Sequence, residues 1–335
     1  MSLTPVPLPP GFGGGLPLAG SRHVRWSQAL GVGGAVPASA LSAAERARLS
    51  APRPDLCGLT LDRPRIMGIL NVTPDSFSDG GAHATLEAAV ARAAEMAGEA
   101  DLLDIGGEST RPGAREVPED EEIARTAPVI REIRARGIAI PISIDTRKAA
   151  VARAALEAGA DMVNDVTALR WDPRMAPLVA ERGVPVCLMH SVADPETMQA
   201  HARYDDVLAE VCDHLAARIE AAEAAGIARR NIVTDPGIGF GKTLAHNLTL
   251  LRGLARLHDL GAPVLLGASR KRFIGTLSDS GDEMSGRLPG SLAVALHGAA
   301  QGIQILRVHD VRETRRALRV WQGLAGEDGE TEDGA

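Results

Sequence analysis

The chain has 335 residues, of which 45% are hydrophobic. This length suits two domains of average size or one α/β barrel, which commonly takes about 250 residues. The formal net charge of −7 and the lack of a long basic run argue against a nucleic acid or an anionic membrane as partner. No apolar run reaches the roughly 18 residues that a membrane helix needs. Cys57, Cys187 and Cys212 lack metal-ligand or redox spacing, so we expect reduced thiols and a cytoplasmic location.

Residues 1–60 are rich in glycine, proline and alanine, and we expect a loosely structured extension with one short element around His23–Leu30. They lack the charged start and apolar segment of a secretory signal. Every candidate site residue lies beyond them, so deletion of residues 1–55 is expected to leave turnover nearly unchanged. Residues 326–335 are mostly acidic and small, and we expect a short solvated tail.

Residues 61–325 alternate short apolar runs with alanine-rich stretches of helical period, which predicts one domain of alternating strands and helices. The predicted strands are Ile66–Asn71, Leu102–Ile105, Ala139–Asp145, Met162–Asp165, Val184–His190, Asn231–Asp235, Pro263–Ala268 and Ile303–Val308. The clearest predicted helices are Leu86–Ala97, Glu121–Arg136, Ala149–Ala158 and Val207–Ala225. Eight strand–helix units within about 265 residues predict a (β/α)8 TIM barrel. A doubly wound open sheet is the alternative, but no glycine-rich dinucleotide turn follows the first strand.

Each predicted strand ends in polar or charged residues. In chain order these are Asn71, Asp104, Asp145, Asn164, His190, Asp235, Ser269 and Arg307. In a barrel the carboxyl ends of all strands meet at one mouth, where the active sites of this fold lie. One aspartate after a strand is more often a helix cap than a catalytic group. Capping does not readily explain all eight strand ends, so we predict a functional site at the mouth.

The residue types indicate the chemistry of this mouth. Asp145, Asn164 and Asp235 suit a flat heterocycle with several N–H donors, because a carboxylate accepts paired hydrogen bonds. A cationic group on the other side suits an anion such as pyrophosphate. Its members are Ser269, Arg270, Lys271, Arg307 and His309. The oxygen of Asn71 is suited to bind Mg²⁺ when phosphates supply other ligands. The implied substrate is a polar heterocycle that carries a phosphate or pyrophosphate.

Five segments resemble signatures of the dihydropteroate synthase family. Two of them, Asn71–Gly81 (NVTPDSFSDGG) and Asp104–Gly113 (DIGGESTRPG), follow the first two strands. The other three match in order and with plausible spacing, and are Asp235–Lys242, Ser269–Lys271 and Arg307–Asp310. The resemblance covers almost all of the predicted barrel, residues 62–322. It implies that the protein condenses (7,8-dihydropterin-6-yl)methyl diphosphate with p-aminobenzoate in folate biosynthesis, giving 7,8-dihydropteroate and pyrophosphate.

The same resemblance implies roles for individual residues. The implied catalytic residues are Asp145, Asp235, Lys271 and Arg111. The implied substrate contacts are Asn164, Thr110, Arg307, His309 and Ser269, with Mg²⁺ at Asn71. The residues expected to hold pterin are Asp145, Asn164, Asp235 and Lys271. Those expected to hold pyrophosphate are Asn71, Arg111, Arg307 and His309. A homodimer is expected from the resemblance alone.

Phe240 lies between glycines in a loop at the predicted mouth, and we favour a contact with the aminobenzoate ring over simple packing. Phe77, in the loop after the first strand, receives the same interpretation. Met189 suits either the core or the wall of the pocket. Arg272 stands where many relatives have a serine near the aminobenzoate carboxylate. It either binds that carboxylate or points to solvent.

The segment Gly239–Thr243 resembles the end of a phosphate-binding P-loop. That motif requires a glycine five residues before Gly241, and Pro236 stands there, so the pattern fails. Lys242 therefore receives no function from this motif.

Two other functions are consistent with parts of the sequence. A pterin-binding methyltransferase domain of the same superfamily shares the pterin carboxylates but does not need Arg111, Lys271, Arg307 and His309 together. A paralogue that binds pterin or a partner without turnover does not need the anion-binding residues. Their joint presence favours the synthase, with small-molecule substrates and neither nucleic acid nor membrane as partner.

Overall fold

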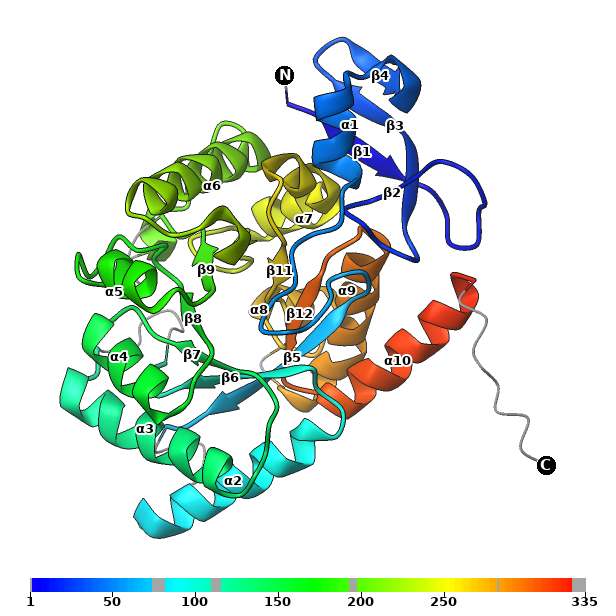
Figure 1. The fold of residues 1–335 in the computed structure, drawn as a ribbon. Helices are drawn as coiled ribbons and strands as arrows, with labels where there is room; N and C mark the ends of the chain where they lie inside the picture. Colours follow the sequence, from blue (N-terminus) through cyan, green and yellow to red (C-terminus); the bar gives the residue numbers. More distant parts are fainter. Residues whose placement is uncertain (1, 74–81, 110–115, 193–197, 282, 327–335) are drawn as a thin grey trace.

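The computed structural model describes residues 2–73, 82–109, 116–192, 198–281 and 283–326. Eight parallel strands form one sheet in the order β10–β9–β8–β7–β6–β5–β12–β11 (Figure 1). They are β5 (Arg65–Asn71), β6 (Leu102–Gly106), β7 (Ile142–Asp145), β8 (Met162–Asp165), β9 (Val186–Met189), β10 (Ile232–Asp235), β11 (Leu265–Leu266) and β12 (Ile305–Val308). Each predicted strand overlaps one of these, and the predicted barrel is confirmed.

The ring closes between β10 and β11, and this joint is its weakest seam. Thr234 and Val264 form an isolated parallel bridge, and Thr234 N donates to Pro263 O at 2.9 Å. β11 has only two residues, whereas the joint between β5 and β6 pairs five. Closure therefore depends on the packing around this seam as well as on its hydrogen bonds.

Helices surround the ring (Figure 1). They are α2 (Ala82–Ala97), α3 (Glu119–Ala135), α4 (Ala149–Ala158), α5 (Met175–Arg182), α6 (Val207–Ala224), α7 (Leu244–Arg252), α8 (Arg272–Leu277), α9 (Leu288–Ala300) and α10 (Val311–Leu324). The four predicted helices overlap α2, α3, α4 and α6. No helix in the described part of the chain is long and apolar enough to span a bilayer.

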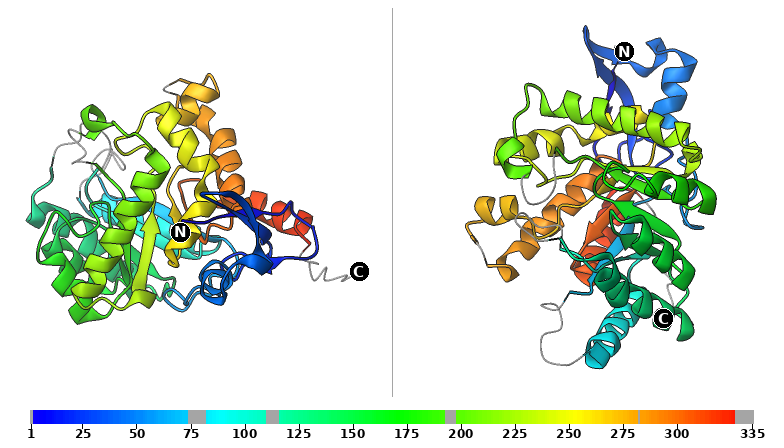
Figure 2. Two further views of the ribbon diagram at one scale, coloured as in Figure 1. Left: turned by 90° about the horizontal axis from the view of Figure 1, so that it is seen from above. Right: turned by 90° about the vertical axis from the view of Figure 1, so that its left-hand side faces the viewer.

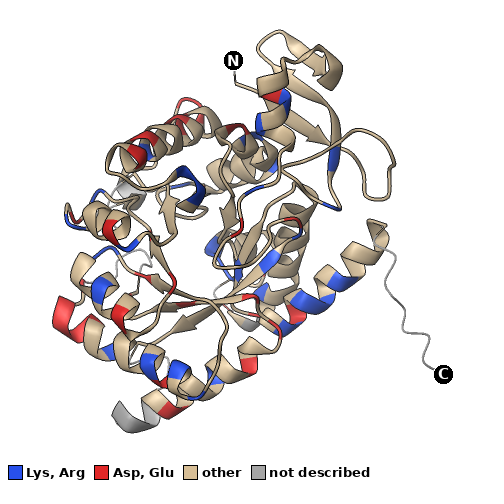
Figure 3. Ribbon diagram, in the orientation of Figure 1, with Lys and Arg blue, Asp and Glu red and all other residues tan. Residues whose placement is uncertain are grey.

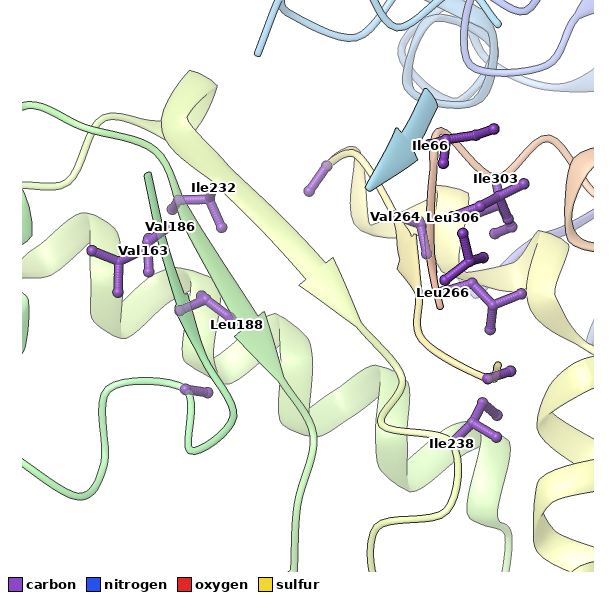
Figure 4. Close-up of a cluster of buried hydrophobic side chains, with 14 of the residues drawn as sticks. Ile66, Val163, Val186, Leu188, Ile232, Ile238, Val264, Leu266, Ile303 and Leu306 are labelled. Carbon is purple, nitrogen blue, oxygen red and sulfur yellow. The ribbon is translucent and has the colours of Figure 1, made fainter. Parts of the chain in front are cut away.

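The ends of these helices follow from local sequence. Asp206 precedes α6, and its carboxylate accepts hydrogen bonds from the backbone N–H groups of Leu208 and Ala209. α4 ends at Gly159, whose φ of 113° lies in a region that residues with a side chain rarely adopt. The main core lies between the ring and the helices, where Val163, Val186 and other strand side chains pack (Figure 4).

A separate apolar cluster closes the floor of the barrel, the end opposite the mouth. Leu56 and Leu61, from the segment before β5, pack there against side chains near the amino ends of the strands. Those side chains are Met67, Leu102, Met162, Cys187, Val233, Leu265 and Ile305. An antiparallel bridge between Leu56 and Leu59 folds the segment back on itself. The mouth is therefore the open end of the barrel.

Residues 4–37 form a four-stranded antiparallel sheet, which corrects the expected loosely structured extension. Its strands are β1 (Thr4–Pro7), β2 (Leu16–Pro17), β3 (Arg25–Gly31) and β4 (Gly34–Pro37), and α1 (Ala43–Ser50) follows. Leu18 and Trp26 in this region are fully buried. Figures 1 and 2 show the sheet at one side of the barrel, and Figure 3 shows how few charges it carries.

The N-terminal sheet is attached to the barrel by specific contacts. Arg48 Nη2 lies 2.7 Å from Asp259 Oδ1, and Leu3 N donates to Asp259 Oδ2 at 3.0 Å. Arg53 Nη2 donates to His258 O at 3.0 Å. Both partners lie in the 3₁₀ helix Leu254–Leu260, which leads into the seam at β11. The sheet therefore packs on the segment that precedes the weakest joint of the ring.

Candidate active site

The polar residues at the strand ends lie side by side around the mouth. The register pairs Asn71 with Gly106, Gly106 with Asp145, and Asp145 with Asn164, across β5 to β8. Asp235 is the last residue of β10. Parallel strands end at the same edge of the sheet, so the fold itself gathers these side chains.

Arg307, on β12, bridges two buried carboxylates at the centre of the mouth. Its Nε donates to Asp104 Oδ2 at 2.5 Å and its Nη2 donates to Asp145 Oδ2 at 2.7 Å. Asn164 Nδ2 also donates to Asp104 Oδ2, at 3.2 Å. Burial disfavours the charge on Arg307, but Asp104 and Asp145 outweigh this effect and raise the pKa of the guanidinium. Arg307 thus neutralises part of the negative charge of Asp104 and Asp145.

Each of these two carboxylates keeps one oxygen available. Asp104 Oδ1 and Asp145 Oδ1 are buried and have no hydrogen-bond partner among the described residues. Burial raises the pKa of Asp145 to about 7; Arg307 opposes the shift and Asp104 adds to it. A buried acceptor without a donor costs roughly 1–3 kcal/mol. The pair is therefore suited to accept N–H groups from a bound ligand.

Asp235, Lys271 and Phe240 form a second group, beside the ends of β10 and β11. Asp235 Oδ1 accepts from Gly237 N at 2.7 Å, and burial raises the pKa of Asp235 against the effect of Lys271. Lys271 Nζ donates to Ile238 O and lies 4.3 Å from the centre of the Phe240 ring. Burial lowers the pKa of Lys271 to about 7, although Asp235 opposes the shift. A carboxylate, an amine and an aromatic face are thus held together at the mouth.

Ser269 and His309 are brought together by the ends of β11 and β12. Ser269 Oγ lies 3.1 Å from His309 Nδ1 and accepts from His309 N at 3.3 Å. Arg270, which the sequence placed in the same cationic group, is paired with Asp310 instead. Its φ of 56° is unusual for a residue with a side chain. Arg270 is thus held by Asp310 in the turn after β11, next to the pair Ser269–His309.

The remaining predicted residues are placed as follows. Phe77, Thr110 and Arg111 lie outside the described residues. Met189 is only 3% exposed and lies against Gly237, in the loop that carries Phe240, so it is a buried residue beside this loop.

Asn71 is half-buried at the end of β5. No group of three or more His, Cys, Asp or Glu side chains that could hold a metal ion occurs within the residues that the structure describes. A metal ion beside Asn71 would therefore take most of its ligands from substrate and water, as Mg²⁺ commonly does. Arg272 is exposed in the first turn of α8.

Comparison with known proteins identifies the family. A family model described as pterin binding enzyme matches residues 67–309, most of the chain. Dihydropteroate synthase of Escherichia coli K12 is 50% identical over 264 residues, which are 78% of this chain and 92% of that protein. The chain belongs to the dihydropteroate synthase family. The predicted family and its transferase reaction in folate biosynthesis are thereby confirmed.

Solved dihydropteroate synthases have the same fold. A structure of the Xanthomonas albilineans enzyme with 4-aminobenzoic acid is 53% identical with a TM-score of 0.77, covering 83% of this chain and 99% of that one. A structure of the same enzyme with 7,8-dihydropteroate is 52% identical with a TM-score of 0.73, covering 82% and 99%. The N-terminal sheet lies outside the residues that the family model matches.

Asp104 is the residue that sequence reasoning passed over in this dihydropteroate synthase fold. It was noted as a polar strand end but received no role, although its carboxylate binds both Arg307 and Asn164. The available signal was its place in the second signature, two residues before Gly106. A charge within an otherwise apolar strand, LLDIG, rarely stays buried without a partner.

Proposed function

We propose that the mouth of this barrel is the site at which the dihydropterin diphosphate and p-aminobenzoate are joined. The observation that carries the proposal is the buried pair Asp104 and Asp145, which lies beside Asp235 and Lys271. One carboxylate oxygen of each has no hydrogen-bond partner among the described residues. Among the relatives, one solved structure holds 4-aminobenzoic acid and another 7,8-dihydropteroate. The acceptors suit the N–H groups of a pterin.

In the proposed complex, Asp145, Asn164, Asp235 and Lys271 hold the pterin ring. The C–O bond between the pterin methylene and pyrophosphate breaks first, and its electron pair leaves with pyrophosphate. The carboxylates of Asp145 and Asp235 offset the positive charge that develops on the ring. The amine lone pair of p-aminobenzoate then forms the C–N bond, and the amine loses a proton.

The leaving pyrophosphate is assigned to Ser269, His309 and Arg307. The first two are already in contact, while Arg307 is paired with Asp104 and Asp145. Asn71 is the residue that would hold Mg²⁺, which supplies charge stabilisation to the pyrophosphate oxygens when bound. Phe240 offers the aromatic face for the aminobenzoate ring, and Met189 supports the loop below it. Phe77, Thr110 and Arg111 keep the roles that the sequence resemblance implies.

Cytoplasmic location and a homodimer complete the proposal. The three cysteines are free thiols, two of them fully or nearly buried, which agrees with a reducing compartment. The homodimer rests on the family resemblance, and light scattering of the purified protein tests it.

The direct test of the proposed function is release of pyrophosphate and formation of 7,8-dihydropteroate by the purified protein. We expect both products only when dihydropterin diphosphate, p-aminobenzoate and Mg²⁺ are all present, and loss of both on chelation. Pterin binding in calorimetry without any pyrophosphate release would instead identify a binding paralogue. Methyl transfer from a methylated pterin to a corrinoid would favour the methyltransferase.

Replacing Lys271 by Ala is expected to weaken pterin binding by roughly 1.5–3 kcal/mol, the range for a hydrogen bond that involves a charged group. The amine of Lys271 lies near Asp235, and it donates a hydrogen bond to Ile238 O. Calorimetry with a pterin that lacks the diphosphate measures this contribution alone. An unchanged dissociation constant would remove Lys271 from the pterin site.

A further inference from the structure

The protein contains only three lysines, Lys148, Lys242 and Lys271, against 33 arginines. Lys148 and Lys242 are 1% and 4% exposed, and Lys271 is half-buried at the mouth. The exposed cations are thus arginines. An ammonium group carries three hydrogens on one small atom, whereas guanidinium is a wide planar fork. A lysine in this chain is therefore informative, because it marks a place where several acceptors converge on one point.

Lys242 occupies such a place. Its Nζ donates to Gly237 O at 2.9 Å and to Phe240 O at 3.0 Å, and it lies 3.0 Å from His190 Nδ1. Burial, and then the charge of Lys242, lowers the pKa of His190 to about 2, so the imidazole is neutral and accepts. In its charged form the amine has three hydrogens for these acceptors, and His190 O lies 3.5 Å away as well. None of the ion pairs between described residues involves Lys242. Burial, and then the charge of Lys271, lowers the pKa of Lys242 to about 7, and the charge of Asp235 opposes the shift.

The loop after β10 is folded tightly around this amine. Gly237 has a φ of 66°, and a side chain there would meet His190 O at 2.0 Å. Gly241 has a φ of 59° and leaves similarly little room beside Val192. Asn247, which is also buried, accepts a hydrogen bond from Gly239 N on its Oδ1 at 2.7 Å. Lys242 and Asn247 together therefore fix the backbone from residue 237 to residue 241.

This backbone presents two groups to Lys271. Ile238 O accepts a hydrogen bond from Lys271 Nζ, and the Phe240 ring lies 4.3 Å from the same atom. Ile238 lies between the two carbonyl groups that Lys242 holds, and Phe240 carries one of them. A shift of the loop would move the carbonyl and the ring together, and with them the position of Lys271.

We propose that Lys242 is a positioning residue: it holds the loop Gly237–Gly241 so that Phe240 and Lys271 are correctly placed for p-aminobenzoate and pterin. The inference rests on the proposed function of the mouth. Lys242 does not touch either substrate in this assignment, and it acts through the loop. It also gives the lysine of the failed P-loop pattern a role that does not involve phosphate.

The first test is Lys242→Met, which keeps an unbranched side chain, one atom shorter, and removes the amine donors. We expect KM for p-aminobenzoate to rise about tenfold or more, with a smaller fall in kcat. The reason is that a loop without these hydrogen bonds no longer holds the Phe240 ring in position for the substrate. Asn247→Ala, which removes the side-chain acceptor of Gly239 N in the same loop, should raise the same KM. This second variant keeps the test valid if Lys242→Met does not fold.

The second readout is spectroscopic. With ¹⁵N-labelled lysine, the side-chain spectrum of this protein has only three amine sources, and Lys271→Met assigns one of them. We expect the Lys271 signal to shift in Lys242→Met and Asn247→Ala. Leu49→Ala, in α1 and far along the chain from the mouth, is the control for lost stability alone, and it should leave KM and the Lys271 signal unchanged.

Two results would overturn the proposal. One is a folded Lys242→Met protein with a lower melting temperature but with the parental KM and an unshifted Lys271 signal, which would make Lys242 a packing residue. The other is an equal rise in KM in Leu49→Ala, which would make the effect one of general stability. A parent protein that releases no pyrophosphate would refute the proposed function first, and the Lys271 signal would still report on the loop.

Discussion

A variant that lacks residues 1–52 is expected to melt roughly 10 °C or more below the parent, because removing the N-terminal sheet uncovers apolar surface on the barrel. Leu18 is fully buried and packs close to Gly302 and His258. Asp259 would lose its contacts with Arg48 and Leu3. Calorimetry measures the change, and kcat per folded molecule should stay near the parental value because the site residues begin at Asn71.

Two single substitutions distinguish docking of the sheet from general effects of truncation. Leu18→Ala should cost about 2–5 kcal/mol of unfolding free energy, the range for a buried leucine. Val32→Ala, at a side chain that is 92% exposed, should cost almost nothing. A truncated protein with the parental melting temperature would show that the sheet is an independent attachment.

Replacing Asp235 by Asn is expected to lower kcat by about 10²–10³, comparable to the loss of one group that stabilises transition-state charge. Asparagine keeps the shape and one oxygen for Gly237 N, but it removes the negative charge beside the developing cation. Pterin binding should weaken by less than kcat falls, because the charge matters most in the transition state. Steady-state pyrophosphate release and calorimetry separate the two effects.

Asp101→Asn is the matched control for this substitution. Asp101 precedes β6 at the floor of the barrel, where its Oδ2 accepts from Ile66 N at 2.7 Å and pairs with Arg315. The control should melt earlier and keep the parental kcat. If Asp235→Asn retained kcat within about threefold of the parent, the charge of Asp235 would have no part in the chemical step.

The barrel and most of its mouth were predictable because they follow from a repeated local pattern. Short apolar runs ending in a polar residue identify both the strands and their carboxyl ends, so Asn71, Asp145 and Asp235 were placed without knowledge of contacts. The observed strand ends differ from the predicted ones by at most three residues. Such a difference does not move a residue from the mouth to the floor of the barrel. In this fold, strands that follow one another in the sequence are also neighbours in the barrel.

The parts that sequence could not predict depend on partners far apart in the chain. Arg307 was assigned to pyrophosphate, but which anion it meets in the free protein is decided by Asp104 and Asp145, more than 160 positions earlier. The element expected around His23–Leu30 overlaps β3, but the other three strands of the N-terminal sheet were missed because they have only two to four residues and contain Pro or Gly. The pairing of Arg270 with Asp310 likewise arises from the close approach of two strand ends.

The closed floor of the barrel has a kinetic consequence. Leu56 and Leu61 seal one end, so ligands enter and leave at the same opening. Asp104 and Asp145 are buried, whereas Phe240 is half-buried. In the proposed complex, a pterin ring held at the buried carboxylates must arrive before an aminobenzoate ring on Phe240, and it cannot leave past that ring. We expect an ordered sequence in which p-aminobenzoate analogues slow the escape of bound pterin, and in which pterin never displaces a product that still occupies the rim.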